Sequence, residues 1–225
     1  MTEPIQTILV PQGAEYQAVI RALSQTHGVK PVVLPIPVGM KAVTSYLEKW
    51  HKTKEVVPQR AIVMGLCGSL SSQYTIGDIV VYRDCVYGEF NYSPDPFLTN
   101  LVSDKLKARV REVRALTSDR LIWSSTEKAR LGTIYNSSVV DMEGYAVLEV
   151  LGKIGVAVTM VRVISDNCYG NIPDLNSAIS TSGKLETLPL VYAMVRQPVA
   201  AVRLIRGALK GLKVLEQVTI DLFSQ

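Results

Sequence analysis

Two segments of the chain place acidic side chains where chemistry is expected. Residues 161–166 (VRVISD) form an apolar run that ends in the carboxylate of Asp166, and residues 139–144 (VVDMEG) place Asp141 and Glu143 after a β-branched pair. Such apolar, β-branched runs predict buried strands. Because open α/β sheets bind ligands at the carboxyl ends of their strands, we expect these acids to meet at one edge of a sheet.

The carboxyl groups suggest acid and hydroxyl-binding roles, each with a simpler alternative. A partly desolvated carboxyl group at Asp166 can hold and donate a proton. Alternatively, Ser165, Asp166 and Asn167 form a helix N-cap, which the local sequence alone favours. A carboxylate at Glu143 can accept two hydroxyl donors at once. Alternatively, it is an ordinary acid of a first helical turn, stabilised by the helix dipole.

Strands alternate with helices along the chain, which predicts a mainly parallel sheet covered on both faces. We expect strands at residues 7–10, 32–37, 61–64, 79–82, 120–123, 138–140 and 156–164, and helices at 14–26, 41–50, 143–152, 176–195 and 198–217. Between them we expect a glycine-containing turn at 76–78, a surface loop at 86–100 and a basic amphipathic stretch at 103–115. The predicted fold is a single α/β domain over residues 1–225, with a mixed, mostly parallel central sheet flanked by helices.

The composition points away from several functional classes. A chain of 225 residues with 48% apolar content can bury a substantial core, and a net charge of +4 demands no nucleic-acid partner. No run approaches the roughly 18 apolar residues of a membrane span, and residues 1–10 do not resemble a signal peptide. We therefore expect a cytoplasmic protein with no membrane partner. The three cysteines and two histidines lack metal-ligand spacing, so we expect no metal and no organic cofactor.

A basic helix near the carboxyl end offers a different function. Arg203, Arg206, Lys210 and Lys213 recur at three- and four-residue spacing beside an apolar stripe. Such a face could bind an anionic membrane or nucleic acid. The simpler interpretation is an amphipathic helix that covers the sheet.

Taken together, the motifs resemble the nucleoside phosphorylase and nucleosidase superfamily, from about residue 7 to about residue 195. GLCGSL at 65–70 with IGDIVV at 76–81 resembles its glycine-rich turn and following strand, and PVGMKA at 37–42 is a weaker match. DMEG at 141–144 resembles its ribose-binding turn, and VRVISD at 161–166 its strand end. The chain is most similar to the methylthioadenosine/S-adenosylhomocysteine nucleosidase and futalosine hydrolase branch. The resemblance implies the fold of that superfamily and a homodimer or higher homo-oligomer.

The resemblance also implies hydrolysis of the N-glycosidic bond of a purine nucleoside with a modified 5′ group. Asp166 would be the acid at N7 of the base, oriented by Ser165, and Glu15 would activate the water. The match at Glu15 is loose. An alternative register places Ala18 opposite the family's glutamate and leaves no base, and a solvated helix acid is a further alternative. The aspartate at 166 favours 6-aminopurines.

The remaining site residues would bind the substrate by the same resemblance. Glu143 would hold the ribose hydroxyls and Met142 would pack against the sugar, whereas Asp141 would be structural or a cap. Cys67 and Gly68 would lie beside the ribose, where small residues allow close approach. Leu121 and Ile122 would give the base apolar walls and backbone groups.

Water rather than phosphate is the expected nucleophile. The positions that match the phosphate ligands of related phosphorylases are Val63, Leu66 and residues 11–15, none of which offers a cation or a hydroxyl group. One alternative is a phosphorylase that uses a relocated arginine, with Arg83, Arg120 and Arg162 as candidates. The other is a nucleoside-binding protein without catalytic activity.

Overall fold

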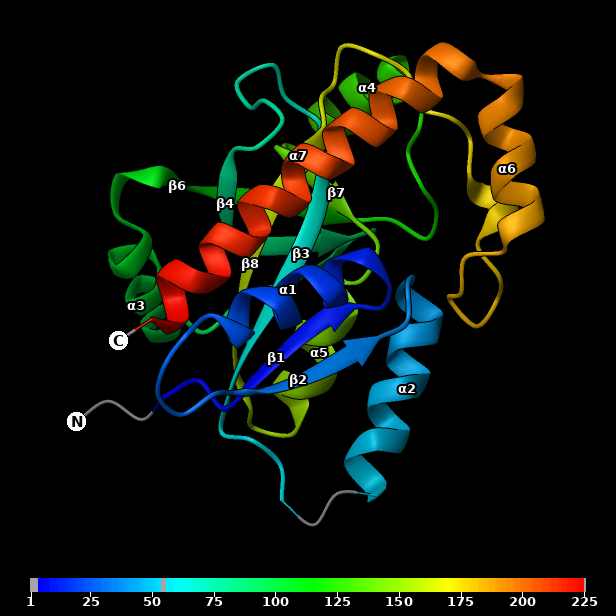
Figure 1. Cartoon of the computed structure of the whole chain (residues 1–225). Coiled ribbons are helices and arrows are strands. Elements are labelled where there is room, and N and C mark those ends of the chain that lie inside the picture. Colours follow the sequence, from blue (N-terminus) through cyan, green and yellow to red (C-terminus); the bar gives the residue numbers. More distant parts are fainter. Residues whose placement is uncertain (1–3, 54–55, 225) are drawn as a thin grey trace.

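A mixed sheet runs through the middle of the molecule (Figure 1). The structure, a computed structural model, describes residues 4–53 and 56–224. In this part the strands are β1 (Thr7–Pro11), β2 (Val32–Ile36), β3 (Arg60–Ser69), β4 (Ile79–Tyr87), β5 (Phe90–Tyr92), β6 (Val110–Thr117), β7 (Val139–Asp141) and β8 (Ala157–Asp166). The β3–β7, β4–β5 and β4–β8 pairings are antiparallel and the others are parallel. The predicted fold class is confirmed.

Five strands of this sheet close into a ring. β3 pairs with β7, β7 with β6, β6 with β4, β4 with β8, and β8 again with β3. Near the end of β3, Gly68 lies opposite Val140 of β7 on one side and Asp166 of β8 on the other. Ring closure therefore brings the two acid-containing strand ends to the same rim.

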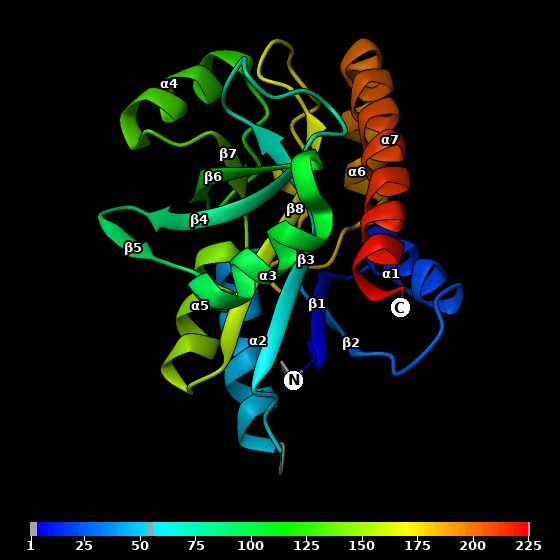
Figure 2. The same cartoon turned by 90° about the vertical axis from the view of Figure 1, so that its left-hand side faces the viewer.

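Helices cover both faces of the sheet (Figures 1 and 2). On one face lie α1 (Ala14–Ser24), α3 (Pro96–Leu106) and α7 (Pro198–Phe223), and on the other α2 (Met40–Thr53) and α5 (Gly144–Lys153). Two further helices, α4 (Ser125–Tyr135) and α6 (Thr187–Arg196), lie outside these layers. The α/β layering places one apolar core on each side of the strands.

Strand β8 lies at the centre of this packing, and its residues from Val158 to Asp166 are all buried. Strands with helices on both faces are expected to be apolar throughout. Met160 and Ile164 pack into the core under α2 and α5, whereas Val161 and Val163 pack into the core under α1 and α7. Arg162 places a charge in the middle of this strand, and a fully buried guanidinium needs negative partners.

Several predicted elements were wrong because tertiary pairing overrode the local pattern. Residues 65–70, where the resemblance implies a glycine-rich turn, instead continue β3 to Ser69 while it pairs with β7 and β8. Residues 86–100 contain the end of β4, strand β5 and the start of α3 instead of a loop. Helix α3 begins because the Asp95 carboxylate accepts the Leu98 N–H at 2.7 Å and Pro96 starts the helix.

The predicted secondary structure was also wrong in three segments, at residues 103–115, 120–123 and 176–195. The predicted basic stretch at 103–115 is the end of α3 followed by β6, whose outer residues Arg111 and Glu112 are exposed. Residues 120–123 form no strand, and helix α4 after them was not predicted. The predicted helix at 176–195 begins only at Thr187, after a short 3₁₀ turn at Asn176–Ala178.

The carboxyl-terminal helix follows the simpler interpretation of its sequence. Leu215, Val218 and Leu222 of α7 pack into the core that also contains α1 residues. On its polar side, the Arg203 guanidinium donates to the Asn171 carbonyl at 2.5 Å. Within residues 4–53 and 56–224, no single helix is long and apolar enough to cross a membrane, although the bent pair α6–α7 together has that length and composition.

Candidate active site

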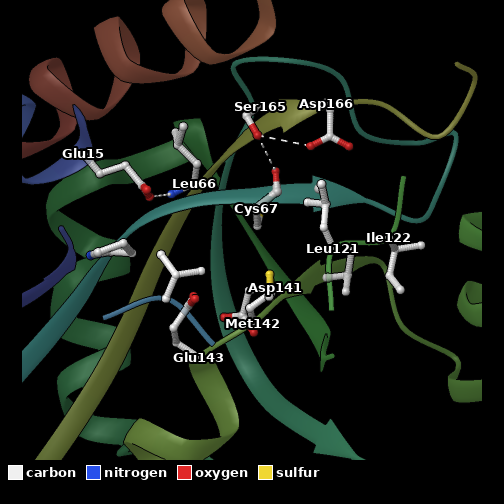
Figure 3. Close-up of a pocket in the computed structure, with 14 residues that line it drawn as sticks. Glu15, Leu66, Cys67, Leu121, Ile122, Asp141, Met142, Glu143, Ser165 and Asp166 are labelled. Carbon is white, nitrogen blue, oxygen red and sulfur yellow. Dashed lines mark hydrogen bonds between the residues drawn. The ribbon is translucent and has the colours of Figure 1, made fainter. Parts of the chain in front are cut away.

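A pocket with a volume of about 180 Å³ opens at the rim where β1, β3, β7 and β8 end (Figure 3). Every residue that the sequence predicted for the site lines it: Glu15, Cys67, Gly68, Leu121, Ile122, Met142, Glu143, Ser165 and Asp166. Pro11, Val38, Leu66, Val140 and Asp141 complete the lining. The pocket therefore gathers residues from segments that are far apart in the sequence.

Asp166 and Ser165 form the end of β8 at one wall of the pocket. The Ser165 hydroxyl lies 3.2 Å from Asp166 Oδ1 and 3.3 Å from the Cys67 carbonyl oxygen, within donating distance of both (Figure 3). A Cβ atom at Gly68 would fall 3.0 Å from Asp166 Oδ2, so a larger residue would displace this carboxylate. No α-helix starts after Asp166 within the described residues before α6, which excludes the N-cap alternative.

Glu15 enters the pocket from the first turn of α1. Its Oε1 accepts the Leu66 N–H at 2.6 Å (Figure 3). Burial raises the pKa of Glu15 to about 7, although the Leu66 N–H and the charge of Arg162 act in the opposite direction. Ala18 is instead fully buried in the core under α1. Glu15 is thus neither a solvated surface acid nor displaced by the alternative register.

Glu143 lines the pocket from the position directly before α5. Its Oε1 accepts the Gly39 N–H at 2.9 Å, and its Oε2 is 3.6 Å from Arg162 Nη2. Burial raises the pKa of Glu143 to about 7, with Arg162 acting against and Asp141 adding to the rise. Glu143 and Glu15 can therefore each change protonation state near neutral pH.

Arg162 and Asp141 form the buried base of the pocket. Arg162 Nη2 donates to Asp141 Oδ2 at 3.1 Å. Asp141 also accepts from the Tyr82 hydroxyl at 3.1 Å, the Thr117 hydroxyl at 2.7 Å and the Gly144 N–H at 3.1 Å. This fits the expected structural and capping role of Asp141, since four donors leave its carboxylate little freedom to reach a ligand.

The guanidinium of Arg162 stays charged despite full burial. Burial acts to lower its pKa, but the negative charge of Asp141 and the other groups around it outweigh burial, so the pKa is raised above its ordinary value. Its Nε and Nη1 have no hydrogen-bond partner among the residues that the structure describes. Arg162 does not line the pocket, so its charge acts on the site through the carboxylates of Asp141, Glu143 and Glu15 around it.

Gly65 opens the GLCGSL motif but was not among the residues predicted for the site. A Cβ atom there would fall 2.6 Å from Glu15 Oε1 and even closer to Arg162 Nη1. Glycine is therefore required between this carboxylate and this guanidinium. The signal that could have found the group is the charge of Arg162 inside an apolar strand run, because such a charge demands buried acids nearby.

Lys128 is a further residue that the sequence analysis missed. It comes from α4 and is fully buried, and its ammonium group donates to Asp166 Oδ2 and, at 3.1 Å, to the Asn167 carbonyl. No local signal marks it, since α4 itself was not predicted. The acid at the end of β8 is consequently paired with a buried cation.

The apolar side of the pocket matches its prediction only in part. Leu121 and Ile122 line the pocket, but the Leu121 N–H donates to Asn176 Oδ1 at 2.8 Å and is not free for a ligand. A second hollow of about 270 Å³ adjoins the pocket and shares Val38 and Met142 with it. Asn176 also lines this hollow, so the segment after β8 contributes to it.

The site combines paired acids, a buried arginine and an apolar wall at strand ends, which is the arrangement of a small-molecule enzyme of the α/β class. The chain belongs to the phosphorylase superfamily, whose family profile matches residues 8–185. It is 25% identical over 182 residues to a 5′-methylthioadenosine/S-adenosylhomocysteine nucleosidase of Shewanella halifaxensis, covering 71% of this chain and 79% of that protein.

Solved structures share the fold at lower sequence identity. A 5′-methylthioadenosine/S-adenosylhomocysteine nucleosidase of Helicobacter pylori, solved with butyl-thio-DADMe-Immucillin-A, has a TM-score of 0.67 and 17% identity, covering 96% of this chain and 98% of that one. The native futalosine hydrolase of Helicobacter pylori has a TM-score of 0.66 and 18% identity over the same shares. The fold expected from the resemblance is thereby confirmed.

Proposed function

We propose that the protein is a nucleosidase that hydrolyses the N-glycosidic bond of a purine nucleoside with a modified 5′ group. The observation that carries the proposal is the convergence of Asp166, Glu143 and Glu15 on one pocket. Membership of the superfamily and similarity to methylthioadenosine/S-adenosylhomocysteine nucleosidases support the same reaction class. Asp166 faces the base, Glu143 holds the ribose and Glu15 activates the water.

The reaction divides charge between the two ends of the pocket. As the C1′–N9 bond breaks, its electron pair moves to the base, and a proton delivered by Asp166 to N7 neutralises that charge. The ribose becomes oxocarbenium-like, and Glu15 takes a proton from the attacking water. Glu143 accepts the 2′- and 3′-hydroxyl groups, which fixes the sugar between the two.

The charges around Arg162 favour water over phosphate as the nucleophile. Arg162 is the relocated arginine that a phosphorylase would need, but it already pairs with Asp141 and lies 3.6 Å from Glu143. Glu15 adds further negative charge beside it. A phosphate dianion would meet these carboxylates without a free counter-charge, which is costly in a buried site.

Purine release is therefore expected without phosphate. The assay measures free base from methylthioadenosine, S-adenosylhomocysteine, adenosine, inosine and futalosine, with and without inorganic phosphate. We expect release whose rate changes by less than about twofold when phosphate is added, since water is the nucleophile. A rate that requires phosphate, with ribose 1-phosphate as the product, would make the protein a phosphorylase. Binding of a nucleoside without any release would indicate a protein without catalytic activity.

Glu143→Gln should weaken recognition of the ribose. Loss of hydrogen bonds to a charged group costs about 1.5–3 kcal/mol, so kcat/KM should fall by roughly tenfold to a hundredfold. The parent should discriminate against 2′-deoxynucleosides, and the variant should discriminate much less. Glu149→Gln is the control, because Glu149 lies on the same helix and pairs with Lys153 away from the pocket. Unchanged discrimination in Glu143→Gln would remove the ribose role.

The adjoining hollow provides room for the 5′ substituent. It meets the pocket at Met142, next to the proposed ribose ligand Glu143, and is lined in part by Ile179 and Ser180. We further propose that the base is a 6-aminopurine and that the protein is cytoplasmic. We also propose a homodimer or higher homo-oligomer, which exposed apolar side chains on α6 support: Leu188, Val191, Tyr192 and Val195.

A further inference from the structure

Lys128 is an unusual residue for the wall of a pocket because its charge is completely withdrawn from solvent. Its exposed fraction is 0%, and its ammonium group contacts Asp166 Oδ2 and the Asn167 carbonyl. A buried ammonium is expensive and persists where a carboxylate compensates it. Lys128 and Asp166 therefore form one charged unit at the end of β8.

The geometry separates the two oxygens of Asp166. Oδ2 takes the Lys128 ammonium, whereas Oδ1 lies 3.2 Å from the Ser165 hydroxyl. Asp166 and Ser165 line the pocket, but Lys128 approaches from behind them and is not part of the lining. Any action of Lys128 on a ligand must therefore pass through Asp166.

The start of α4 holds Lys128 in this place. The helix follows Leu121 and Ile122, which wall the pocket, and begins with Ser125. The Ser125 N–H and hydroxyl both lie within hydrogen-bond distance of Asn171 Oδ1, at 2.9 and 3.0 Å. This ties the helix to the segment that follows β8, so the lysine and the aspartate are positioned by the same local framework.

In such an ion pair the proton that a departing base needs is held by the ammonium, not by the carboxylate. An ionised Asp166 has no proton to donate, and a purine N7 presents a lone pair to it. Lysine can give up a proton in a buried site, whereas arginine effectively cannot. The Lys128–Asp166 pair thus contains a proton donor, the ammonium group, for the lone pair at N7 of the base.

We propose that Lys128 is a positioning residue that supplies, through Asp166, the proton delivered to the leaving purine; this rests on the nucleosidase function proposed above. When the C1′–N9 bond breaks, its electron pair moves to the base. An N–H bond of Lys128 breaks as an O–H bond forms on the Asp166 carboxylate, and that O–H bond then breaks as the N7–H bond forms. Lys128 is left as a neutral amine and Asp166 as a carboxylate. After the base has left, Glu15 releases to solvent the proton that it took from the attacking water, and Lys128 regains a proton from solvent through Asp166.

The test compares substrates that do and do not need this proton. One is the nucleoside that the parent cleaves best, and the other is 4-nitrophenyl β-D-ribofuranoside, whose leaving group departs as a stable anion. In Lys128→Met, kcat for the nucleoside should fall by about a hundredfold, while kcat for the nitrophenyl riboside should stay within about threefold. Lys128→Arg should lose the nucleoside rate in the same way, since it keeps the charge but cannot release the proton. Lys105→Met, at an exposed lysine bonded to the Leu222 carbonyl, is the control.

A double-mutant cycle tests the inference even if the single variant folds poorly or the riboside is not cleaved. Lys128→Met combined with Asp166→Asn removes both charges together. Its nucleoside rate should equal that of Asp166→Asn alone, because Lys128 acts only through Asp166. An additional loss in the double variant would overturn the inference.

The other outcomes separate this inference from the proposed function. Equal losses on both substrates, or a full nucleoside rate in Lys128→Arg, would make Lys128 a structural or purely electrostatic residue. The nucleosidase function would still stand in that case. A parent that releases no purine from any nucleoside would overturn the proposed function, and the role of Lys128 with it.

Discussion

Asp166→Asn is expected to lower kcat for purine release by at least about a hundredfold, the usual scale for loss of a general acid. The asparagine keeps the shape of the side chain, and its carbonyl oxygen can still accept from the Lys128 ammonium while its NH2 group lies beside the Ser165 hydroxyl. What it cannot do is carry a proton to N7. Rates of base release under saturating nucleoside, with parent and variant compared at one pH, measure this effect.

Asp104→Asn is the matched control, since Asp104 is exposed on α3 and outside the pocket lining. The melting temperature of each variant separates lost chemistry from lost folding. A folded Asp166→Asn variant within about tenfold of the parent rate would show that the base leaves without this acid. The hydrolysis would then depend on stabilisation of the ribose, and Glu143 would become its main determinant.

Asp166 was predictable because its signal is local. A buried strand of β8's composition and an acid directly after it place the carboxylate at a strand end, whatever the rest of the fold does. The same holds for Glu143 after β7. Sequence alone could not decide between a cap and a site for Asp166, because that depends on whether a helix follows.

The partners of these acids were not predictable, because they come from segments far away in the sequence. Lys128 reaches Asp166 from α4, 38 residues away in sequence, and α4 lacks a strong apolar pattern. Gly65 matters only because Glu15 and Arg162 flank it, which requires β1, β3 and β8 to be side by side. Contacts of this kind follow from the ring of strands, and local patterns do not encode its closure.

The conformation of strand β6 could not be predicted from its local sequence. Its amino-terminal part carries three charged residues, Arg111, Glu112 and Arg114, and this density of charge predicts a basic amphipathic stretch. It is a strand because β4 and β7 pair with it on both sides, so backbone hydrogen bonding decides its conformation. Prediction was accurate where strands are buried on both faces, as in β1 and β8.

Glu15→Gln is expected to lower kcat/KM by about a hundredfold or more and to change the pH dependence of the reaction. Glutamine can still accept the Leu66 N–H but cannot take a proton from water. The parent needs ionised Glu15, and its pKa is raised to about 7, so activity should fall as the pH drops below 7. Glu143, with a pKa also raised to about 7, adds a second loss in the same range. The acid limb of log kcat/KM should therefore be steeper in the parent than in Glu15→Gln.

Glu15→Gln should lower the rate but raise the stability of the folded protein. This difference separates a catalytic effect from damage to the fold. A carboxyl group whose pKa is higher in the folded state than in the unfolded state costs stability once it is ionised. For Glu15 this cost begins near pH 4.5, the ordinary pKa of a glutamate, and is complete above about pH 7, its pKa in the folded state. Glu15→Gln should thus melt a few degrees above the parent at pH 8 and match it near pH 4.5. Glu48→Gln, at an exposed glutamate of α2, should change neither property. If Glu15→Gln kept both the parent rate and the parent pH profile, Glu15 would not be the group that activates the water.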